Sequence, residues 1–360
     1  MHSVVNELIV YTDMSDINYN GRIGNLRSRY NPDRTQLFED RVNRETAGLI
    51  GDTQKYVRMA MMAVSEEYTQ KTILAGETAK EHLKRELTNV DYRYQGSVMT
   101  NTHIRGASDI DLLVLCTKFY HTQISKVRDE LNNVYYHTLA ELANLRSYNN
   151  RFREYQGDCY QDLYYLRLGI ERIMSNKYVI CDTSKAKSVK ITNQNLHRNV
   201  DVVTSCWNDT YNYVLHGEKE TDRAISIYNK DTRIDEGPDF PFLSISRIND
   251  RSAETNGRLK RMIRFLKNVR SDANVNIDLS SFEINAICYD IPIQEYNHKE
   301  YTDLVGIIWS KMNHLWKDGA ADNLRSVVGD EYVFRGKPEK VRALQLLVDE
   351  VYHIICDLKK

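Results

Sequence analysis

The chain has 360 residues, of which 41% are hydrophobic and 28% charged, a balance typical of a globular protein large enough for two domains or one bilobal unit. Its 49 Lys and Arg residues against 50 Asp and Glu residues leave a net charge of −1. A near-neutral chain is not held on nucleic acid by its overall field, so we expect no strong nucleic-acid binding.

The six cysteines are scattered, without a Cys-x-x-Cys pair or a matching histidine spacing, so neither a zinc motif nor a disulfide framework is predicted. The N-terminus lacks the apolar segment of a signal peptide, and no apolar run approaches the length of a membrane span. We therefore expect a soluble, cytoplasmic protein that does not enter a membrane.

The N-terminal part of the chain is predicted to be helical in its second half. Residues 1–50 have mixed polarity and receive no assigned role. Between residues 53 and 90 proline is absent and apolar residues recur at helical spacing. One or two helices are predicted there, and Gly76 is a position where a helix could bend or break.

A turn with glycine and serine follows, and then an apolar strand that opens with two aspartates. The run 110–116 is apolar enough for a strand buried on both faces. Residues two apart in a strand point to the same face and lie about 6.5–7 Å apart, so Asp109 and Asp111 can converge on one metal ion.

The turn itself offers a phosphate site. Gly96 lets the backbone approach a phosphate closely, and the Ser97 hydroxyl with the amides of a helix start can hold it. A plain turn with a helix cap at Ser97 is the alternative, and the two interpretations are compatible. Thr100 and Thr102 are further polar residues of the same connection.

Helices and strands then alternate as in a mixed sheet with helices on one face. Helices are predicted over residues 123–145 and 163–174, strands over 189–192 and 200–204, and a hairpin over 225–234. Two prolines within residues 237–241 mark the boundary between lobes, and four helices are predicted beyond it, over residues 255–270, 281–289, 301–317 and 339–358.

A third aspartate, Asp201, lies within a β-branched run typical of a central strand. If this strand pairs beside the run 110–116, three carboxylates form one cluster. Mg²⁺ is usually held by a few carboxylates and substrate phosphates, and two such ions about 3.5–4 Å apart can activate a hydroxyl and stabilise leaving pyrophosphate. Any one aspartate alone would more often be a strand-end carboxylate paired with a surface arginine.

The predicted helix over residues 255–270 has an apolar stripe at i, i+3, i+4, i+7 spacing with Lys260, Arg264 and Lys267 along one flank. The ordinary interpretation of such a flank is a solvated basic face. Further on, Ser280, Ser281 and Phe282 fit a capped helix start with an apolar first turn.

Three of these motifs, in this order, resemble the DNA-polymerase-β-type nucleotidyltransferase superfamily: Gly96-Ser97, Ser108-Asp109-Ile110-Asp111-Leu112 and Val200-Asp201-Val202-Val203. The segments 242–249 and 255–267 are similar to those of bacterial cyclic-oligonucleotide synthases of anti-phage signalling, relatives of cyclic GMP-AMP synthase and oligoadenylate synthase. The resemblance covers roughly residues 50–290.

The resemblance implies an α+β, bilobal protein: residues 1–237 would form N-terminal helices and the catalytic lobe with a polymerase-β-like mixed sheet, and residues 238–360 a helical lobe that closes the nucleotide cleft. It implies that Asp109 and Asp111 bridge two Mg²⁺ or Mn²⁺ ions on the triphosphate. Asp201 would hold the ion that lowers the pKa of the attacking ribose hydroxyl.

The remaining implied contacts are to nucleotide. Lys260 is the residue that best matches the lysine placed on the triphosphate in the family, with Arg264 as second choice. Ser281 would meet the phosphates and Phe282 would stack on a base.

The implied reaction joins nucleoside triphosphates, ATP among them, into a cyclic di- or trinucleotide that a downstream effector binds. A nucleotidyltransferase acting on a protein, an RNA end or a small molecule would use the same acids, and a non-catalytic nucleotide-binding scaffold is the alternative from another class. The sequence leaves open the base, the linkage, the ring size and the activating signal.

Overall fold

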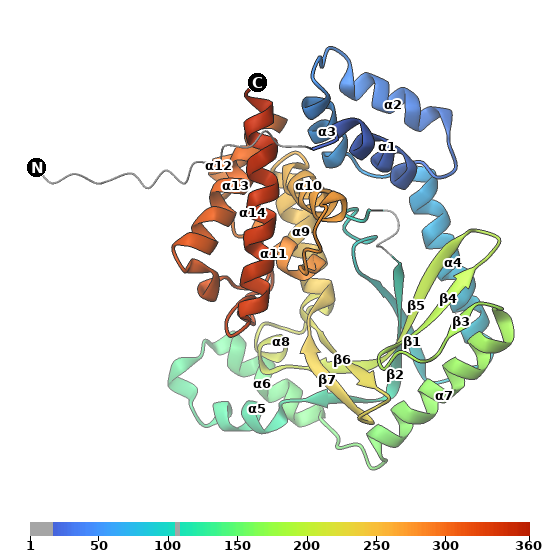
Figure 1. The fold of residues 1–360 in the computed structure, drawn as a ribbon. Helices are drawn as coiled ribbons and strands as arrows, with labels where there is room; N and C mark the ends of the chain where they lie inside the picture. Colours follow the sequence, from blue (N-terminus) through green and yellow to red (C-terminus); the bar gives the residue numbers. More distant parts are fainter. Residues whose placement is uncertain (1–16, 105–108) are drawn as a thin grey trace, which may run out of the picture.

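The computed structural model describes residues 17–104 and 109–360. A seven-stranded mixed sheet forms the centre of one lobe, with β2 and β5 parallel and the other paired strands antiparallel (Figure 1). Five strands lie in the order β1 (Val90–Gln95), β2 (Ile110–Thr122), β5 (Arg198–Asp209), β4 (Ser188–Asn193) and β3 (Cys181–Asp182). The far end of β5 pairs instead with β6 (Ala224–Asn229), which pairs with β7 (Ile234–Asp239).

Helices cover one face of this sheet, as predicted. Alternate residues of β2 and β5, among them Leu112 and Val202, are fully buried beneath α4 (Glu66–Lys84) and α7 (Cys159–Lys177). The intervening residues, including Asp111, point to the opposite face, which is left for a site. A small satellite cluster is formed by α5 (Ile124–Leu131), α6 (Leu139–Arg151) and α8 (Tyr211–Leu215).

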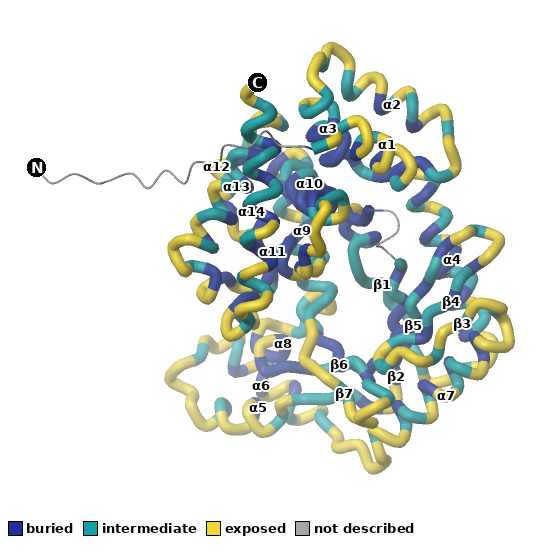
Figure 2. The backbone as a smooth tube through the Cα atoms, viewed as in Figure 1, coloured by how far each residue is buried: buried dark blue, intermediate teal, exposed yellow. Residues whose placement is uncertain are grey.

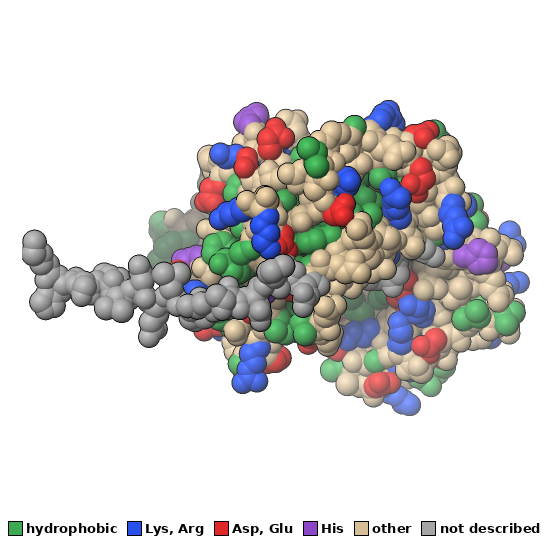
Figure 3. Space-filling view, turned by 45° about the horizontal axis from the view of Figure 1, so that its top comes forward, with side chains coloured by type: hydrophobic (Ala, Val, Ile, Leu, Met, Phe, Trp, Pro, Cys, Tyr) green, Lys and Arg blue, Asp and Glu red, His purple; other side chains and the backbone are tan. Residues whose placement is uncertain are grey.

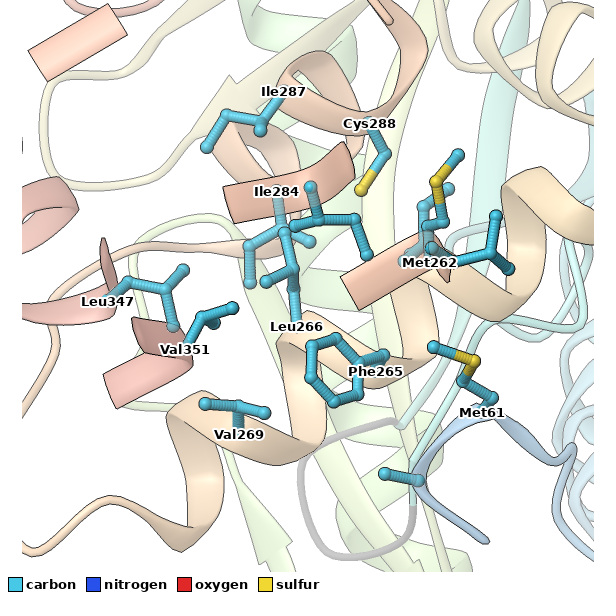
Figure 4. Close-up of a cluster of buried hydrophobic side chains, with 14 of the residues drawn as sticks. Met61, Met262, Phe265, Leu266, Val269, Ile284, Ile287, Cys288, Leu347 and Val351 are labelled. Carbon is cyan, nitrogen blue, oxygen red and sulfur yellow. The ribbon is translucent and has the colours of Figure 1, made fainter. Parts of the chain in front are cut away.

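The second lobe is helical and begins where β7 ends. Its helices are α9 (Pro241–Glu254), α10 (Arg258–Asp272), α11 (Ser281–Tyr289), α12 (Ile293–Tyr296), α13 (Tyr301–Lys317) and α14 (Pro338–Leu358). Figure 4 shows the packed centre of this lobe, where Phe265 and Leu266 of α10 meet Ile284 of α11 and Val351 of α14. The four helices predicted for this part of the chain are confirmed within three residues at each end.

The N-terminal helices belong to this helical core, which differs from the predicted grouping of residues 1–237. They are α1 (Tyr19–Tyr30), α2 (Gln36–Thr46) and α3 (Asp52–Met61). Their buried residues, such as Tyr30, Tyr56 and Met61, share one apolar cluster with α10, α11, α13 and α14. In space the first helices therefore lie with the end of the chain, and α4 links them to the sheet (Figure 1).

One predicted helix is divided in the structure. Within the segment 123–145, which was predicted as one helix, α5 ends at Leu131, and the Asn132 side chain donates to the Arg128 carbonyl there. The next helix, α6, begins after Thr138, which forms a capping box with Glu141.

The one or two helices predicted between residues 53 and 90 are two, α3 and α4, and the Ser65 side chain caps α4. Gly76 neither bends nor breaks α4. A Cβ at Gly76 would lie 2.9 Å from the ring of Tyr94 and 3.3 Å from Ile110, so glycine here lets the helix approach the sheet.

Acidic and basic side chains are interspersed on the face drawn in Figure 3. No helix within residues 17–104 and 109–360 combines the length and the apolar character needed to cross a bilayer.

Candidate active site

Two neighbouring parallel strands bring the three predicted carboxylates together. Asp111 of β2 lies directly opposite Asp201 of β5, and Asp109 precedes Asp111 by two residues. The side chains of these three aspartates line one cleft, of about 390 Å³, between the sheet and the helical lobe. The predicted pairing of the two strands is confirmed, while the metal-binding and catalytic roles of the aspartates stay predictions.

The electrostatics of this cluster fit a divalent cation. Burial, together with the neighbouring charges of Asp201 and Asp109, raises the pKa of Asp111 to about 7. Two lysines partly offset the repulsion: Lys190 is paired with Asp109, and Lys185 Nζ lies 3.4 Å from Asp201 Oδ1. Mg²⁺ and Mn²⁺ are bound in proteins by carboxylate oxygens, and a bound cation would relieve the repulsion among these three aspartates.

The glycine of the Gly-Ser turn is required by its contact with the cluster. Gly96 has φ +89°, and a Cβ there would lie only 2.5 Å from Asp111 Oδ2. The turn is stabilised from behind, because the Ser97 carbonyl accepts hydrogen bonds from Thr102 N at 3.0 Å and Thr100 Oγ1 at 3.2 Å.

Ser97 and Thr100 line the cleft, whereas Thr102 is buried away from it. The segment after Gly96 forms turns up to Asn101, so the expectation of a helix start at Ser97 is wrong. The amides available to a phosphate are those of the turns themselves.

The opposite wall of the cleft contains the predicted Ser281 and Phe282, at the start of α11. Ser280, not Ser281, caps this helix: its hydroxyl accepts from Phe282 N at 3.1 Å and forms a capping box with Glu283. The capping interpretation therefore applies to the neighbouring serine, and Ser281 is left to face the cleft. The Phe282 side chain is 40% exposed, as a stacking surface requires.

The two basic residues predicted to bind phosphate are not among the described residues that line the cleft. Arg264 is buried, and its guanidinium donates to the carbonyls of Met61 at 2.9 Å and Asn101 at 2.7 Å. The expectation that Arg264 reaches nucleotide is therefore not met, because its donors are used to join α10 to the rest of the fold. Lys260 is half-buried beside Arg264, and its triphosphate contact stays a prediction.

Several residues that line the cleft or pair with its aspartates were missed from the sequence. Lys190 had a detectable signal, since it alternates with the buried Val189 and Ile191 of β4 and must point to the face of the aspartates. Three further carboxylates that line the cleft had none: Asp239, Asp330 and Glu331.

Asp330 and Glu331 belong to a loop, 324–333, whose position depends on a long-range contact. The Arg247 guanidinium of α9 donates to the carbonyls of Val327 and Val328 at 3.0 and 2.7 Å. Since the loop has no regular pattern, only this contact and the fold around it reveal that it lines the cleft.

Two polar atoms within the cleft are buried without a hydrogen-bond partner among the described residues. They are Oε1 of Gln95, at the end of β1, and Oδ1 of Asn285, on α11. Unpaired buried polar atoms are rare in proteins unless a ligand or water completes them. Both atoms are therefore available to a polar ligand or to water in the cleft.

Comparisons with known proteins agree with this geometry. The family model of the "cGAS/DncV-like nucleotidyltransferase C-terminal helical domain" matches residues 246–355. A protein of a Lachnospiraceae bacterium named c-di-GMP synthase is 55% identical over 345 residues, which cover 96% of this chain and all of that protein.

Solved structures are similar over nearly the whole chain. The CdnE c-di-GMP synthase of Capnocytophaga granulosa, described as STING-associated, has 39% identity and a TM-score of 0.79, with 95% of this chain and 99% of that chain covered. The corresponding synthase of a Flavobacteriaceae species has 34% identity and a TM-score of 0.85 over 96% and 99%. The chain therefore belongs to the cGAS/DncV-like nucleotidyltransferases, the bacterial cyclic-oligonucleotide synthases that its sequence motifs resemble.

Proposed function

We propose that this protein condenses two molecules of GTP into cyclic di-GMP with release of two pyrophosphates, as a signal in defence against phage. The observation that carries the choice of base is a second group of carboxylates in the cleft, formed by Asp239, Asp330 and Glu331, in addition to the three predicted aspartates. The names of relatives at 55% and 42% identity, each over 96% of this chain, support the same product.

Guanine and adenine differ in what they offer a carboxylate. The Watson–Crick edge of guanine has two adjacent N–H donors, and an ionised carboxylate accepts two such bonds side by side. Adenine has an acceptor at the corresponding position. Asp239, Asp330 and Glu331 all line the cleft, and they lie near enough to one another that burial and the charges of Asp330 and Asp239 raise the pKa of Glu331. A guanine base bound beside them would donate to these carboxylates. This arrangement favours GTP over the ATP expected from the sequence.

We assign the divalent ions, two Mg²⁺ or Mn²⁺, to Asp109, Asp111 and Asp201. Bound there, such ions lower the pKa of a ribose hydroxyl and neutralise the charge that develops on pyrophosphate. The chain's own contribution is positioning: two aspartates on one strand and one on its neighbour present their oxygens to a single region of the cleft.

The remaining residues orient the nucleotides. Gly96 and Ser97 lie beside the aspartates and would hold the triphosphate with backbone amides and a hydroxyl. Phe282 would stack on a base, while Ser281 would donate to phosphate from the other wall. In each of two successive steps a ribose oxygen forms a bond to the α-phosphorus, the bond to pyrophosphate breaks, and the hydroxyl proton leaves to solvent.

The effector would bind the product rather than this protein. The cytoplasmic location and the absence of strong nucleic-acid binding remain predictions.

The activity is tested directly. The purified protein is incubated with each NTP alone and with all four, with Mg²⁺ or Mn²⁺, treated with phosphatase and analysed by mass spectrometry. A phosphatase-resistant cyclic di-GMP made from GTP alone, and absent with the D109A/D111A variant, is expected. A mixed or adenine-only ring would overturn the base assignment, and linear products or labelled protein would point to a different acceptor.

The role of Asp330 and Glu331 in selecting the base is tested separately with D330N/E331Q, and D322N, at an exposed position, is the control. We expect the first variant to lose at least about tenfold in kcat/KM for GTP, since each charge-assisted hydrogen bond contributes about 1.5–3 kcal/mol. Equal loss for ATP and GTP would mean that these carboxylates do not select the base.

A further inference from the structure

A second group of metal-ligating side chains lies on the face of the sheet opposite the catalytic aspartates. Nε2 of His121 (β2), Sγ of Cys206 (β5) and a carboxylate oxygen of Asp235 (β7) all lie within 4.8 Å of one another. Asp235 Oδ2 is 2.5 Å from His121 Nε2 and 3.7 Å from Cys206 Sγ. This group could not be predicted from the sequence, because its members come from three separate strands.

An irregularity in the sheet creates this cluster. Cys206 lies opposite Cys116, but the next residue of β5 pairs with Tyr120, so residues 117–119 of β2 form a bulge. The bulge brings His121 alongside the end of β5 and onto the side of α7. The hairpin supplies the third ligand, since Asp235 pairs with Tyr228, a residue of the same buried cluster as Cys206.

The contact between the histidine and the aspartate is short but lacks regular hydrogen-bond geometry. His121 Nε2 is buried, and Asp235 Oδ2 lies 2.5 Å from it. A cation placed between the two side chains would instead use the lone pairs of both.

We propose that His121, Cys206 and Asp235 form a structural site for a borderline transition-metal cation of the Zn²⁺ type, separate from the Mg²⁺ or Mn²⁺ of the catalytic aspartates. Imidazole and thiolate ligands select Zn²⁺ or Co²⁺, whereas Mg²⁺ takes oxygen ligands. Ligand atoms about 2.0–2.3 Å from a tetrahedral zinc lie roughly 3.3–3.7 Å apart. The separation of Cys206 and Asp235 already matches, and His121 must move away from Asp235 by about 1 Å.

The fourth position is directed toward a surface hollow. His121 and Cys159 both line this cavity of about 680 Å³, together with Tyr155 and Glu154. Water entering from the hollow, or the thiol of Cys159, would complete a tetrahedral site. Cys159 is near enough that the Asp235 carboxylate, after burial, contributes to raising the pKa of its thiol.

Binding of the cation releases protons from its ligands. The Cys206 S–H bond breaks as the metal–sulfur bond forms, and that proton leaves to the buffer. In the tautomer with the proton on His121 Nε2, that proton moves to Nδ1 or to solvent; in the other tautomer the Nε2 lone pair is already free for the cation. The bound cation would join β2, β5 and β7 behind the strand that carries Asp201.

The test uses the full chain with the D109A/D111A changes, which remove the oxygen site and make the result independent of the proposed activity. Co²⁺ is added anaerobically as the probe, and its absorption spectrum is recorded. We expect one equivalent to give the intense visible bands of tetrahedral cobalt and a thiolate-to-cobalt charge-transfer band. Adding Cys206→Ser should abolish the charge-transfer band and weaken binding at least about tenfold, while Cys356→Ser leaves both unchanged.

Two further readouts keep the outcome decisive. If Cys206→Ser fails to fold, His121→Gln is used, with circular dichroism to confirm folding; it should lose the tetrahedral bands. Zn²⁺ should raise the Tm of the D109A/D111A protein, and this increase should vanish with His121→Gln. A folded protein that shows no thiolate-to-cobalt band, or the same band with and without Cys206, would overturn the site.

Discussion

The sheet wall of the cleft and helix α10 both have charged residues at regular spacing, but the structure uses them in opposite ways. Asp109, Asp111 and Asp201 converge in the cleft as the strand pattern predicts. Arg264 and Lys267 of α10 are buried and turn inward to backbone carbonyls. A strand has only two faces, so when one face is buried, the alternate residues must point to the other. A helix that packs against neighbours on many sides can bury charged residues as well, so spacing alone does not show which of its residues are exposed.

The position of α10 explains its different role. It contacts α1, α3, α9, α11, α13 and α14, and its middle, residues 262–269, is buried and dark blue in Figure 2. Arg264 donates to Asn101 and Lys267 donates to Thr102, in the connection that follows the Gly-Ser turn. Arg264 and Lys267 therefore hold in place the connection that follows the Gly-Ser turn, at the cost of burying two basic side chains.

The largest expected effect comes from the sheet wall. Replacing both aspartates in D109A/D111A removes the ligands of the proposed metal ions, each of which provides several kcal/mol of charge stabilisation. We expect product formation to fall by at least about 1,000-fold with the fold retained. Initial rates of pyrophosphate release, with circular dichroism as the folding check, measure this, and residual activity above one-tenth would refute the metal assignment.

The next largest expected effect comes from the close contact between Gly96 of the turn and Asp111 of β2. Gly96→Ala should lower kcat/KM by about 100-fold, because the new Cβ displaces the Asp111 carboxylate. Gly48→Ala is the matched control, since Gly48 has φ +79° but open space around it. If both variants lose only stability, about 1 kcal/mol each, then backbone strain and not the contact with Asp111 requires the glycine.

Helix α10 should respond in stability rather than in substrate binding. Arg264→Met leaves two carbonyls without their donor and should lower the free energy of unfolding by about 2–4 kcal/mol in urea titration. The KM for GTP of the folded fraction should be unchanged. Lys260→Met, on the same flank, is the comparison. A tenfold higher KM with Arg264→Met, at full stability, would restore the predicted phosphate role.

The smallest effect is a pH dependence at the same helix. Burial, with Arg270 and Arg264 nearby, lowers the pKa of Lys267 to about 7, against about 10.4 in an unfolded chain. Between these values the unfolded chain binds a proton that the folded protein lacks. The free energy of unfolding should therefore rise with pH above 7, by at most about 1.4 kcal/mol per pH unit relative to Lys267→Met.

Urea titrations of both proteins at pH 7, 8 and 9 provide the measurement. The difference between the proteins isolates Lys267 from the tyrosines that titrate at higher pH. Parallel pH profiles for the two proteins would mean that Lys267 stays charged when folded.

Most elements could be predicted from the sequence, and the exceptions have physical causes. The helices after residue 255 were predictable because their apolar residues recur at helical spacing over long segments, and packing in a compact core stabilises helices of this kind. The break after Leu131 was missed because it depends on local side-chain hydrogen bonds of asparagine, which compete with an otherwise continuous apolar pattern. The first strand, β1, was missed because none of its residues is fully buried, so its pattern carries little signal.

The sequence by itself determined the chemistry of the sheet wall: two aspartates at alternate positions of an apolar strand, a third in a second such strand, and a glycine before them. Local alternation and strand burial place Asp109 and Asp111 on one face of their strand, and the pairing of β2 with β5 adds Asp201.

Only the tertiary structure decided which other residues join them. The N-terminal helices pack with the C-terminal lobe, loop 324–333 reaches the cleft through Arg247, and a bulge places His121 beside Cys206. Each depends on contacts between residues far apart in the chain, which no local pattern encodes.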